Sequence, residues 1–130
     1  MRSHAQARLG DRAAVVTWIA ADVTRASLPR EAFDIWHDRA VFHFLTQATD
    51  RAHYIELARN TIRHGGTLVM STFALDGPAR CSGLDVVRYD VAGLAAALGE
   101  AFVLERAFDD LHETPAGALQ HFTVAVFAKR

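Results

Sequence analysis

Residues 50–73, with the sequence DRAHYIELARNTIRHGGTLVMSTF, have the pattern of a helix followed at once by a buried strand. The apolar residues of 50–64 recur at helical spacing, at Tyr54, Ile55, Ala58 and Ile62. Thr49 or Asp50 can cap the start of this helix, and the glycines at 65 and 66 are expected to end it. Residues 67–73 are nearly all apolar, which predicts a strand covered on both faces of its sheet.

On either side of this segment, short apolar runs alternate with polar stretches. The upstream part predicts the end of a helix at 1–9, a strand at 14–21 and a loop at 24–32. A second strand at 33–37 and one turn of helix at 40–47 follow. The downstream part predicts an irregular excursion, a helix capped by Asp90 and an antiparallel hairpin, at residues 76–89, 90–98 and 102–128.

The order of elements is therefore strand, strand, helix, strand, helix, strand, strand, which predicts an α/β fold. The sheet is expected to be mostly parallel, with right-handed crossovers, and to close with the C-terminal antiparallel hairpin. A chain of 130 residues has the size of one domain, and we expect residues 1–130 to form a single one.

Composition narrows the classes of function. The chain is 51% hydrophobic and carries a formal net charge of −1 without a basic cluster, so neither nucleic acid nor membrane is expected as a partner. One cysteine, Cys81, cannot form an internal disulfide, which favours a cytoplasmic location. The seven histidines lack metal-binding spacing, so no metal site is expected.

Polar residues follow three of the predicted strands. Asp22 ends the first strand, residues 37–39 end the second, and residues 71–73 end the third. Ligands of open α/β sheets bind outside the carboxyl ends of the strands, so this layout favours a small-molecule crevice over simple strand termination. We also expect Asp38 and Arg39 to form an ion pair that is at least partly buried.

Three segments in order resemble a class I S-adenosylmethionine-dependent methyltransferase: WIAADVT at 18–24, FDIWHDRAVFHFL at 33–45 and HGGTLVMSTF at 64–73. The resemblance covers essentially the whole chain and is strongest to the small-molecule branch related to thiopurine and tellurite methyltransferases. It implies a Rossmann-like sheet with S-adenosylmethionine as cofactor and S-adenosylhomocysteine as product.

The resemblance also implies roles for the strand-end residues. Asp22 would accept a hydrogen bond from the adenine amino group, and the backbone N–H of Val23 would bind a ring nitrogen. Trp36, His37 and Asp38 would lie against the methionine part of the cofactor, where the face of Trp36 could stabilise the sulfonium. Two simpler interpretations stay open: Asp22 caps the next turn, and Trp36 is a core residue.

For the methyl acceptor, the resemblance implies a small molecule held near residues 76–89. Phe73, Arg80 and Tyr89 are candidates for its pocket, with a solvated loop as the alternative. His37 and His43 are the candidate general bases, because imidazole accepts a proton near neutral pH.

One part of the family pattern is missing. None of the eight glycines falls in a glycine-rich turn after a strand, so the chain resembles the C-terminal two-thirds of such an enzyme. The missing strands would leave the 33–37 strand with an exposed edge, through which we expect homo-oligomer formation or pairing with another polypeptide. The sequence leaves open a methyltransferase that needs complementation, an inactive remnant acting as an interaction module, and another α/β small-molecule binder.

Overall fold

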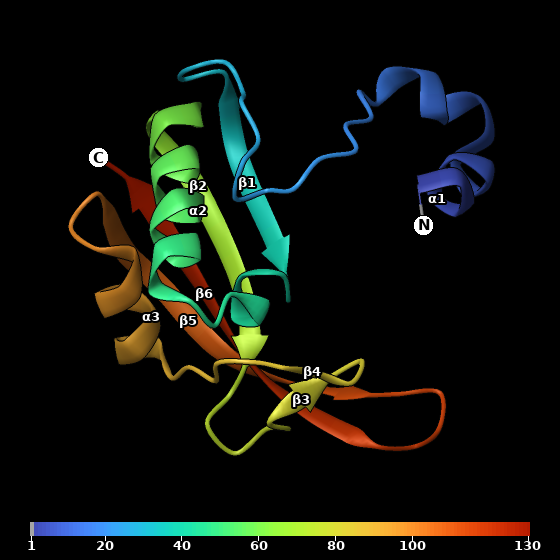
Figure 1. Ribbon diagram of the computed structural model, residues 1–130, viewed down its shortest axis with the longest axis vertical. Coiled ribbons are helices and arrows are strands. Elements are labelled where there is room, and N and C mark those ends of the chain that lie inside the picture. Colours follow the sequence, from blue (N-terminus) through green and yellow to red (C-terminus); the bar gives the residue numbers. More distant parts are fainter. Residues whose placement is uncertain (1) are drawn as a thin grey trace.

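The computed structural model of the protein describes residues 2–130, which form a four-stranded sheet with two helices packed on it (Figure 1). Along the chain the elements are α1 (Arg2–Leu9), η1 (Gly10–Val15), β1 (Phe33–Arg39), η2 (Phe42–Phe44), α2 (Ala48–Thr61), β2 (Ile62–Phe73), β3 (Arg80–Cys81), β4 (Leu84–Asp85), α3 (Val91–Leu98), β5 (Phe102–Glu113) and β6 (Leu119–Lys129). Of the helices among the described residues, none has the length and apolar character that crossing a membrane requires.

The sheet has the strand order β1-β2-β6-β5. Only β1 and β2 run parallel; β6 is antiparallel to both β2 and β5. The α/β fold with its C-terminal antiparallel hairpin is thus confirmed, whereas the prediction of a mostly parallel sheet is wrong. The reason is that one of the expected parallel strands does not form.

That strand was predicted at residues 14–21. Instead, η1 extends to Val15, and residues 16–21 pair with no strand among the described residues. Trp18 donates its indole N–H to the carbonyl of Ala13 at 3.1 Å. A strand is stabilised only by a neighbour, and residues 22–32 are shorter than the dozen or more residues that a parallel crossover to β1 requires. Figure 1 shows α1 and η1 standing away from the sheet.

The junction between α2 and β2 also differs from the prediction. The helix ends at Thr61 rather than at the glycines, and β2 starts at Ile62. Phe33 of β1 pairs with Ile62, but Ile35 pairs with Thr67, so residues 63–66 form a bulge. A Cβ at Gly66 would lie 2.6 Å from Ile62 Cγ2 and 2.9 Å from the Asp34 carbonyl oxygen, so the close approach requires glycine.

The other predicted elements are confirmed within a few residues. α1 ends before Gly10, which has a φ of +57°. Asp90 caps α3 by accepting the N–H of Gly93 at 2.7 Å, and Gly99 ends this helix with a φ of +83°. The predicted excursion at 76–89 is irregular apart from the short β3–β4 hairpin.

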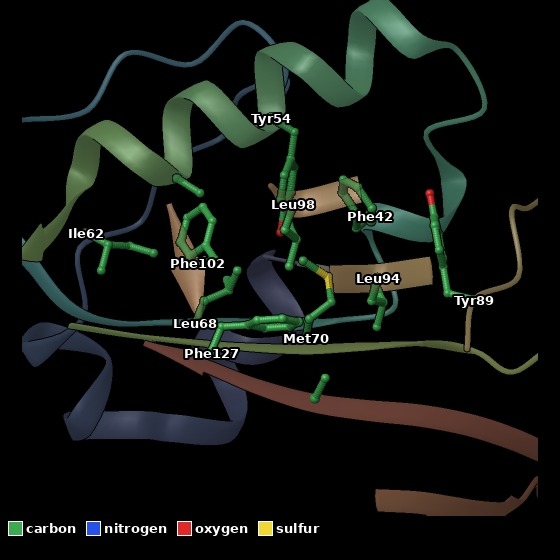
Figure 2. Packing of buried hydrophobic residues seen from close by; sticks show 12 residues of the cluster. Phe42, Tyr54, Ile62, Leu68, Met70, Tyr89, Leu94, Leu98, Phe102 and Phe127 are labelled. Carbon is green, nitrogen blue, oxygen red and sulfur yellow. The ribbon is translucent and has the colours of Figure 1, made fainter. Parts of the chain in front are cut away.

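Two apolar clusters lie on opposite faces of the sheet. The main core packs α2 and α3 against β2 and β6, and Figure 2 shows Tyr54, Leu94 and Leu98 pointing toward Leu68 and Met70. A smaller cluster on the other face contains Phe73, Phe122 and Val124, with Cys81 and Val86 packed against it. The main core therefore fixes α2 over β1 and β2, which determines the geometry of their carboxyl ends.

Candidate functional site

A cavity of about 240 Å³ lies at the carboxyl end of β1. Four segments line it: the loop before β1, the end of β1, the turn after it and one residue of α2. The lining residues are Val23, Trp36, His37, Asp38, Arg39, Val41 and Tyr54. Four of the predicted cofactor residues, Val23, Trp36, His37 and Asp38, are thus brought to one cavity.

Asp38 is the buried polar group of this cavity. Its carboxylate accepts the N–H of Val41 at 2.7 Å, the N–H of Phe42 at 3.0 Å and the hydroxyl of Tyr54. Burial raises the pKa of Asp38, and the three hydrogen bonds oppose that rise. Asp38 therefore holds the turn after β1 and the facing residue of α2.

The expected ion pair between Asp38 and Arg39 does not form. Successive side chains of a strand point to opposite faces of the sheet, and Asp38 is buried while Arg39 is exposed. Tyr54 and two backbone amides take the place of the guanidinium as partners of the carboxylate.

Trp36 is half-buried and takes part in both the core and the cavity. Its indole N–H donates to the Tyr54 hydroxyl at 2.9 Å, and the two rings meet edge to face with centroids 5.5 Å apart. Burial and the neighbouring Asp38 carboxylate raise the pKa of Tyr54. Sequence reasoning placed Tyr54 on the apolar stripe of its helix but gave no sign of its polar role, which arises from contacts distant in sequence.

His37 is exposed and lines the cavity beside Trp36. Val23, by contrast, is half-buried and packs against the main core while it lines the same cavity. These two residues approach the cavity from different segments, so a ligand bound there would contact both β1 and the loop that precedes it.

Asp22 does not line the cavity. Its exposed carboxylate accepts the backbone N–H of Thr24 at 2.9 Å and the hydroxyl of Thr24 at 2.7 Å. These hydrogen bonds lower the pKa of Asp22. In this structure Asp22 stabilises its own turn, as the simpler interpretation of the sequence expected.

His43 is fully buried and does not line the cavity. Its Nδ1 accepts the N–H of Phe73 at 3.1 Å, which places the proton of the neutral ring on Nε2, an atom without a hydrogen-bond partner in the described part of the chain. Burial lowers the pKa of His43 to about 4. The carbonyl of His43 also accepts the N–H of Val87 at 2.8 Å, so this residue joins η2 to the end of β2 and to the excursion.

The three residues predicted for the acceptor pocket do not share a cavity among the described residues. Phe73 belongs to the smaller cluster and Tyr89 to the main core, although the N–H of Tyr89 donates to the Phe73 carbonyl at 3.0 Å. Arg80 is exposed and pairs with Asp85 at 3.0 Å.

A second cavity, of about 500 Å³, was not foreseen from the sequence. It lies between the loop before β1 and α2, and it is lined by Thr24, Arg25, Ala26, Ser27, Leu28, Arg30, His53, Glu56, Leu57, Asn60 and Thr61. Within residues 5–130, whose side chains the structure describes, His, Cys, Asp and Glu form no group of three or more arranged to hold a metal ion.

The fold and the cavity define an α/β protein with a cavity at the carboxyl end of a parallel strand, next to a half-buried tryptophan. Comparison with protein families narrows this class. A model described as a methyltransferase domain matches residues 1–70. Because this match spans more than half of the sequence, the chain belongs to the methyltransferase domain family.

Solved structures share the fold at low sequence identity. An S-adenosylmethionine-dependent methyltransferase from Mesorhizobium loti has a TM-score of 0.70 at 18% identity, covering 99% of this chain and 76% of its own. A Burkholderia thailandensis 1,6-didemethyltoxoflavin-N1-methyltransferase, solved with bound 1,6-didemethyltoxoflavin and S-adenosylhomocysteine, has a TM-score of 0.68 at 21% identity, covering 98% of this chain and 55% of its own. A Methanosarcina mazei protein described as an S-adenosylmethionine-dependent methyltransferase has a TM-score of 0.67 at 12% identity, covering 84% and 65%.

The chain thus spans 55% and 65% of the length of the Burkholderia and Methanosarcina proteins. A search of curated proteins finds no match to the sequence.

Proposed function

We propose that this chain forms part of an S-adenosylmethionine-dependent methyltransferase whose cofactor binds at the carboxyl end of β1. The observation that carries the proposal is the cavity that joins Val23 to Trp36 and His37. These residues lie within the segment that matches the methyltransferase domain family. The bound S-adenosylhomocysteine of the Burkholderia structure, which shares this fold, supports the choice of cofactor.

The residues present fit part of this cofactor. Trp36 offers an aromatic edge and face beside the cavity, and a cation over such a ring gains about 0.5–2 kcal/mol. Both Thr24 hydrogen bonds go to Oδ1 of Asp22, so Oδ2 can accept the adenine amino group while the N–H of Val23 meets a ring nitrogen.

The cavity does not enclose the whole cofactor. Its volume of about 240 Å³ is below the range of roughly 300–1,000 Å³ typical of small-molecule sites. The sequence also has no glycine-rich turn after a strand to receive the methionine tail. We therefore propose that polypeptide outside this sequence completes the site.

When bound, the cofactor supplies an electrophilic methyl group, and the chain positions the reactants. His37 is our candidate for accepting a proton from the acceptor, because it is exposed at the cavity and imidazole can act as a base. Asp38 and Tyr54 hold the strand end and α2 in place. His43 is a candidate for a supporting role, because its ring fixes the N–H of Phe73 at the end of β2.

For the methyl acceptor we propose a small molecule bound near residues 76–89, uncharged or thiol-like. Phe73, Arg80 and Tyr89 stay candidates for its pocket. The toxoflavin precursor in the Burkholderia structure supports a small acceptor on this fold. The resemblance of residues 18–24, 33–45 and 64–73, taken together, to the branch related to thiopurine and tellurite methyltransferases supports the thiol-like class.

Calorimetric titration of the chain with S-adenosylmethionine and S-adenosylhomocysteine tests the proposal. We expect the chain to bind with micromolar affinity. Asp22→Ala should weaken this binding at least about tenfold, because one charge-assisted hydrogen bond is lost. The control Asp110→Ala, at a position that is also exposed, should leave the affinity unchanged. Binding that survives Asp22→Ala would remove the adenine assignment. Absence of heat at millimolar ligand would overturn the proposal that these residues hold the cofactor.

We further propose that the chain forms a homo-oligomer through the open edge of β1. This strand pairs only with β2, and its Ile35 side chain is 65% exposed. The opposite edge strand, β5, carries Glu105, Asp109 and Asp110, charges of the kind that protect sheet edges from association. Glu105 and Asp110 make no ion pair among the described residues, whereas Asp34 of β1 is engaged by Arg63 at 2.7 Å and Asp38 is buried, so β1 has less protection from acidic groups.

A further inference from the structure

His121 of β6 lies between two carboxylates from different parts of the chain. Its Nδ1 is 2.6 Å from an oxygen of Asp76, in the turn after β2, and its Nε2 is 2.9 Å from an oxygen of Asp109 on β5. An ionised carboxylate can only accept hydrogen bonds, so both contacts are made at once only when both ring nitrogens carry a proton. The geometry therefore selects the imidazolium form of His121.

The turn that contains Asp76 is attached to β6 next to His121. The N–H of Ala74 donates to the His121 carbonyl at 2.9 Å, and the N–H of Gly77 closes the turn on the Ala74 carbonyl at 2.9 Å. Arg88, near the far end of the excursion, donates to the Gly77 carbonyl at 3.1 Å. The start of the excursion is therefore held by main-chain hydrogen bonds and by the His121 side chain.

The far end of the excursion is attached to the same strand. Thr123, two residues after His121, donates its hydroxyl to the Tyr89 carbonyl at 2.8 Å. Between the two ends, residues 82–85 are exposed, and the short β3–β4 hairpin and the Arg80–Asp85 ion pair hold them. The N–H of Val87 donates to the His43 carbonyl at 2.8 Å beyond this hairpin. A change at His121 is therefore expected to act mainly on the start of the excursion.

We propose that His121, Asp76 and Asp109 form a pH-dependent clasp that positions residues 74–89 against the β5–β6 hairpin. Protonated His121 closes the clasp by donating to both carboxylates. Loss of the proton breaks one of the two contacts and loosens the start of the excursion. His121 is thus a positioning residue, acting through Asp76 on the segment rather than on a ligand.

The direction of the pH dependence follows from the surroundings of the ring. The hydrogen bonds to Asp109 and Asp76 raise the pKa of His121 above its ordinary value of 6.5. The clasp is then fully closed below about pH 6.5 and opens as the pH rises through the raised pKa. Asp76 faces the ring from the turn and Asp109 from β5, while Arg88 is engaged by the Gly77 carbonyl.

Two other histidines lie near this segment, but their surroundings differ from those of His121. His43 contacts the excursion through Val87, yet its pKa is lowered to about 4, so it titrates in a separate and lower range. His112 sits on the same hairpin and packs its ring against Phe122 at a centroid distance of 6.4 Å. Because this contact is aromatic rather than ionic, His112→Gln is a matched control.

If residues 74–89 border the methyl acceptor, the clasp also makes access of the acceptor depend on pH. This consequence rests on the proposed function. The clasp itself does not. Its test is therefore independent of cofactor and activity. Amide hydrogen exchange of the full chain, corrected for the intrinsic effect of pH, measures the protection of residues 74–90 at about pH 6 and about pH 9.

We expect protection of this segment to fall about two- to fivefold between these pH values, the range of an exposed ion pair, while α2 keeps its protection. His121→Asn should show the lower protection at both pH values, and His112→Gln should behave like the parent chain. Asp76→Asn, at an exposed position, replaces one of the two carboxylates by a neutral amide and should at least halve the effect. It also serves as the test variant if His121→Asn does not fold. Protection independent of pH in the parent chain, or an unchanged pH dependence in Asp76→Asn, would overturn the proposal.

Discussion

At the scale of single residues, the Tyr54 hydroxyl connects the Trp36 and Asp38 side chains of the cavity. It accepts the Trp36 indole N–H at 2.9 Å and donates to the buried Asp38 carboxylate. Removing this hydroxyl leaves a buried donor unpaired and takes one of three donors from a buried carboxylate. Leaving such a group without a partner lowers the free energy of unfolding by more than the net contribution of the hydrogen bond itself.

Tyr54→Phe is therefore expected to lower the free energy of unfolding by about 1–3 kcal/mol. Denaturation in urea measures this change. Tyr89→Phe is the matched control, because that ring is also buried and its hydroxyl has no hydrogen-bond partner among the described residues. A loss of equal size in both variants would show that the hydroxyl network is not the cause.

His43 predicts a pH dependence of stability. Because its pKa falls from 6.5 unfolded to about 4 folded, the unfolded chain binds more protons between these values. Stability from this residue is therefore full above about pH 6.5 and decreases as the pH falls toward 4, by up to about 3 kcal/mol. Asp38, whose pKa burial raises, contributes in the opposite direction at acidic pH.

Urea denaturation at about pH 5 and about pH 7 isolates this contribution when the parent chain is compared with His43→Asn. Asparagine can accept the Phe73 N–H through its side-chain oxygen but does not titrate. We expect the variant to lose most of the difference in stability between the two pH values. An undiminished difference in His43→Asn would assign it to other groups.

Local sequence signals predicted that some residues of the cavity lie together, and they could not predict the contacts of others. Strand alternation and the expected strand end brought Trp36, His37 and Asp38 to one place, and the structure puts them there. The partners of Asp38 and Trp36 were missed, since Tyr54 follows them by 16 and 18 positions and only tertiary packing selects that contact. The same holds for the Phe73 amide on His43.

At the scale of elements, the bulge at residues 63–66, near the start of β2, sets the register in which β2 pairs with β1. Gly66→Ala is expected to destabilise the chain by about 1–3 kcal/mol, because the new methyl group meets the Asp34 backbone and Ile62. Thermal or urea unfolding measures the loss. Gly93→Ala is the comparison: its new Cβ meets the capping oxygen of the exposed Asp90 side chain at 3.0 Å, and alanine favours a helix, so a smaller loss is expected.

The open edge of β1 gives a second prediction at this scale. Ile35→Lys places a charge beside the open edge of β1, and charges there oppose pairing with another chain. We expect this variant to shift the chain from oligomer to monomer. Light scattering at roughly tens of micromolar protein, where exposed edges can associate, measures the shift. Leu111→Lys is matched in exposure, 66% against 65%, but lies on the charged β5 strand. A parent chain that is already monomeric would contradict the proposal of a homo-oligomer.

Elements with a complete local signal were predictable, and those that depend on a neighbour were not. Asp90 and Gly99 delimit α3 by their own chemistry, and the turn after Glu113 delimits the hairpin. Residues 14–21 have the composition of a strand, but a strand needs a partner along its edge. None of the strands among residues 2–130 pairs with this segment.

At the scale of the whole molecule, the sheet is covered unevenly. Both α2 and α3 pack on the face that holds the main core, while the smaller cluster covers only part of the other face. The parallel strands of α/β proteins are normally covered on both faces and continued at their edges. The proposed cofactor site lies at this incomplete end of the sheet, beside β1.

The two tryptophans of the chain allow a direct test of whether the cofactor binds in the cavity at the carboxyl end of β1. Trp36 lines the cavity at the carboxyl end of β1, whereas Trp18 lies in the N-terminal segment with its indole on Ala13. Nuclear magnetic resonance resolves the two indole N–H signals, and Trp18→Phe assigns them. On titration with S-adenosylhomocysteine, we predict that the Trp36 indole signal shifts saturably while the Trp18 signal stays in place. A Trp36 signal that does not move at millimolar ligand, or a shift confined to Trp18, would contradict the assignment of this cavity as the cofactor site.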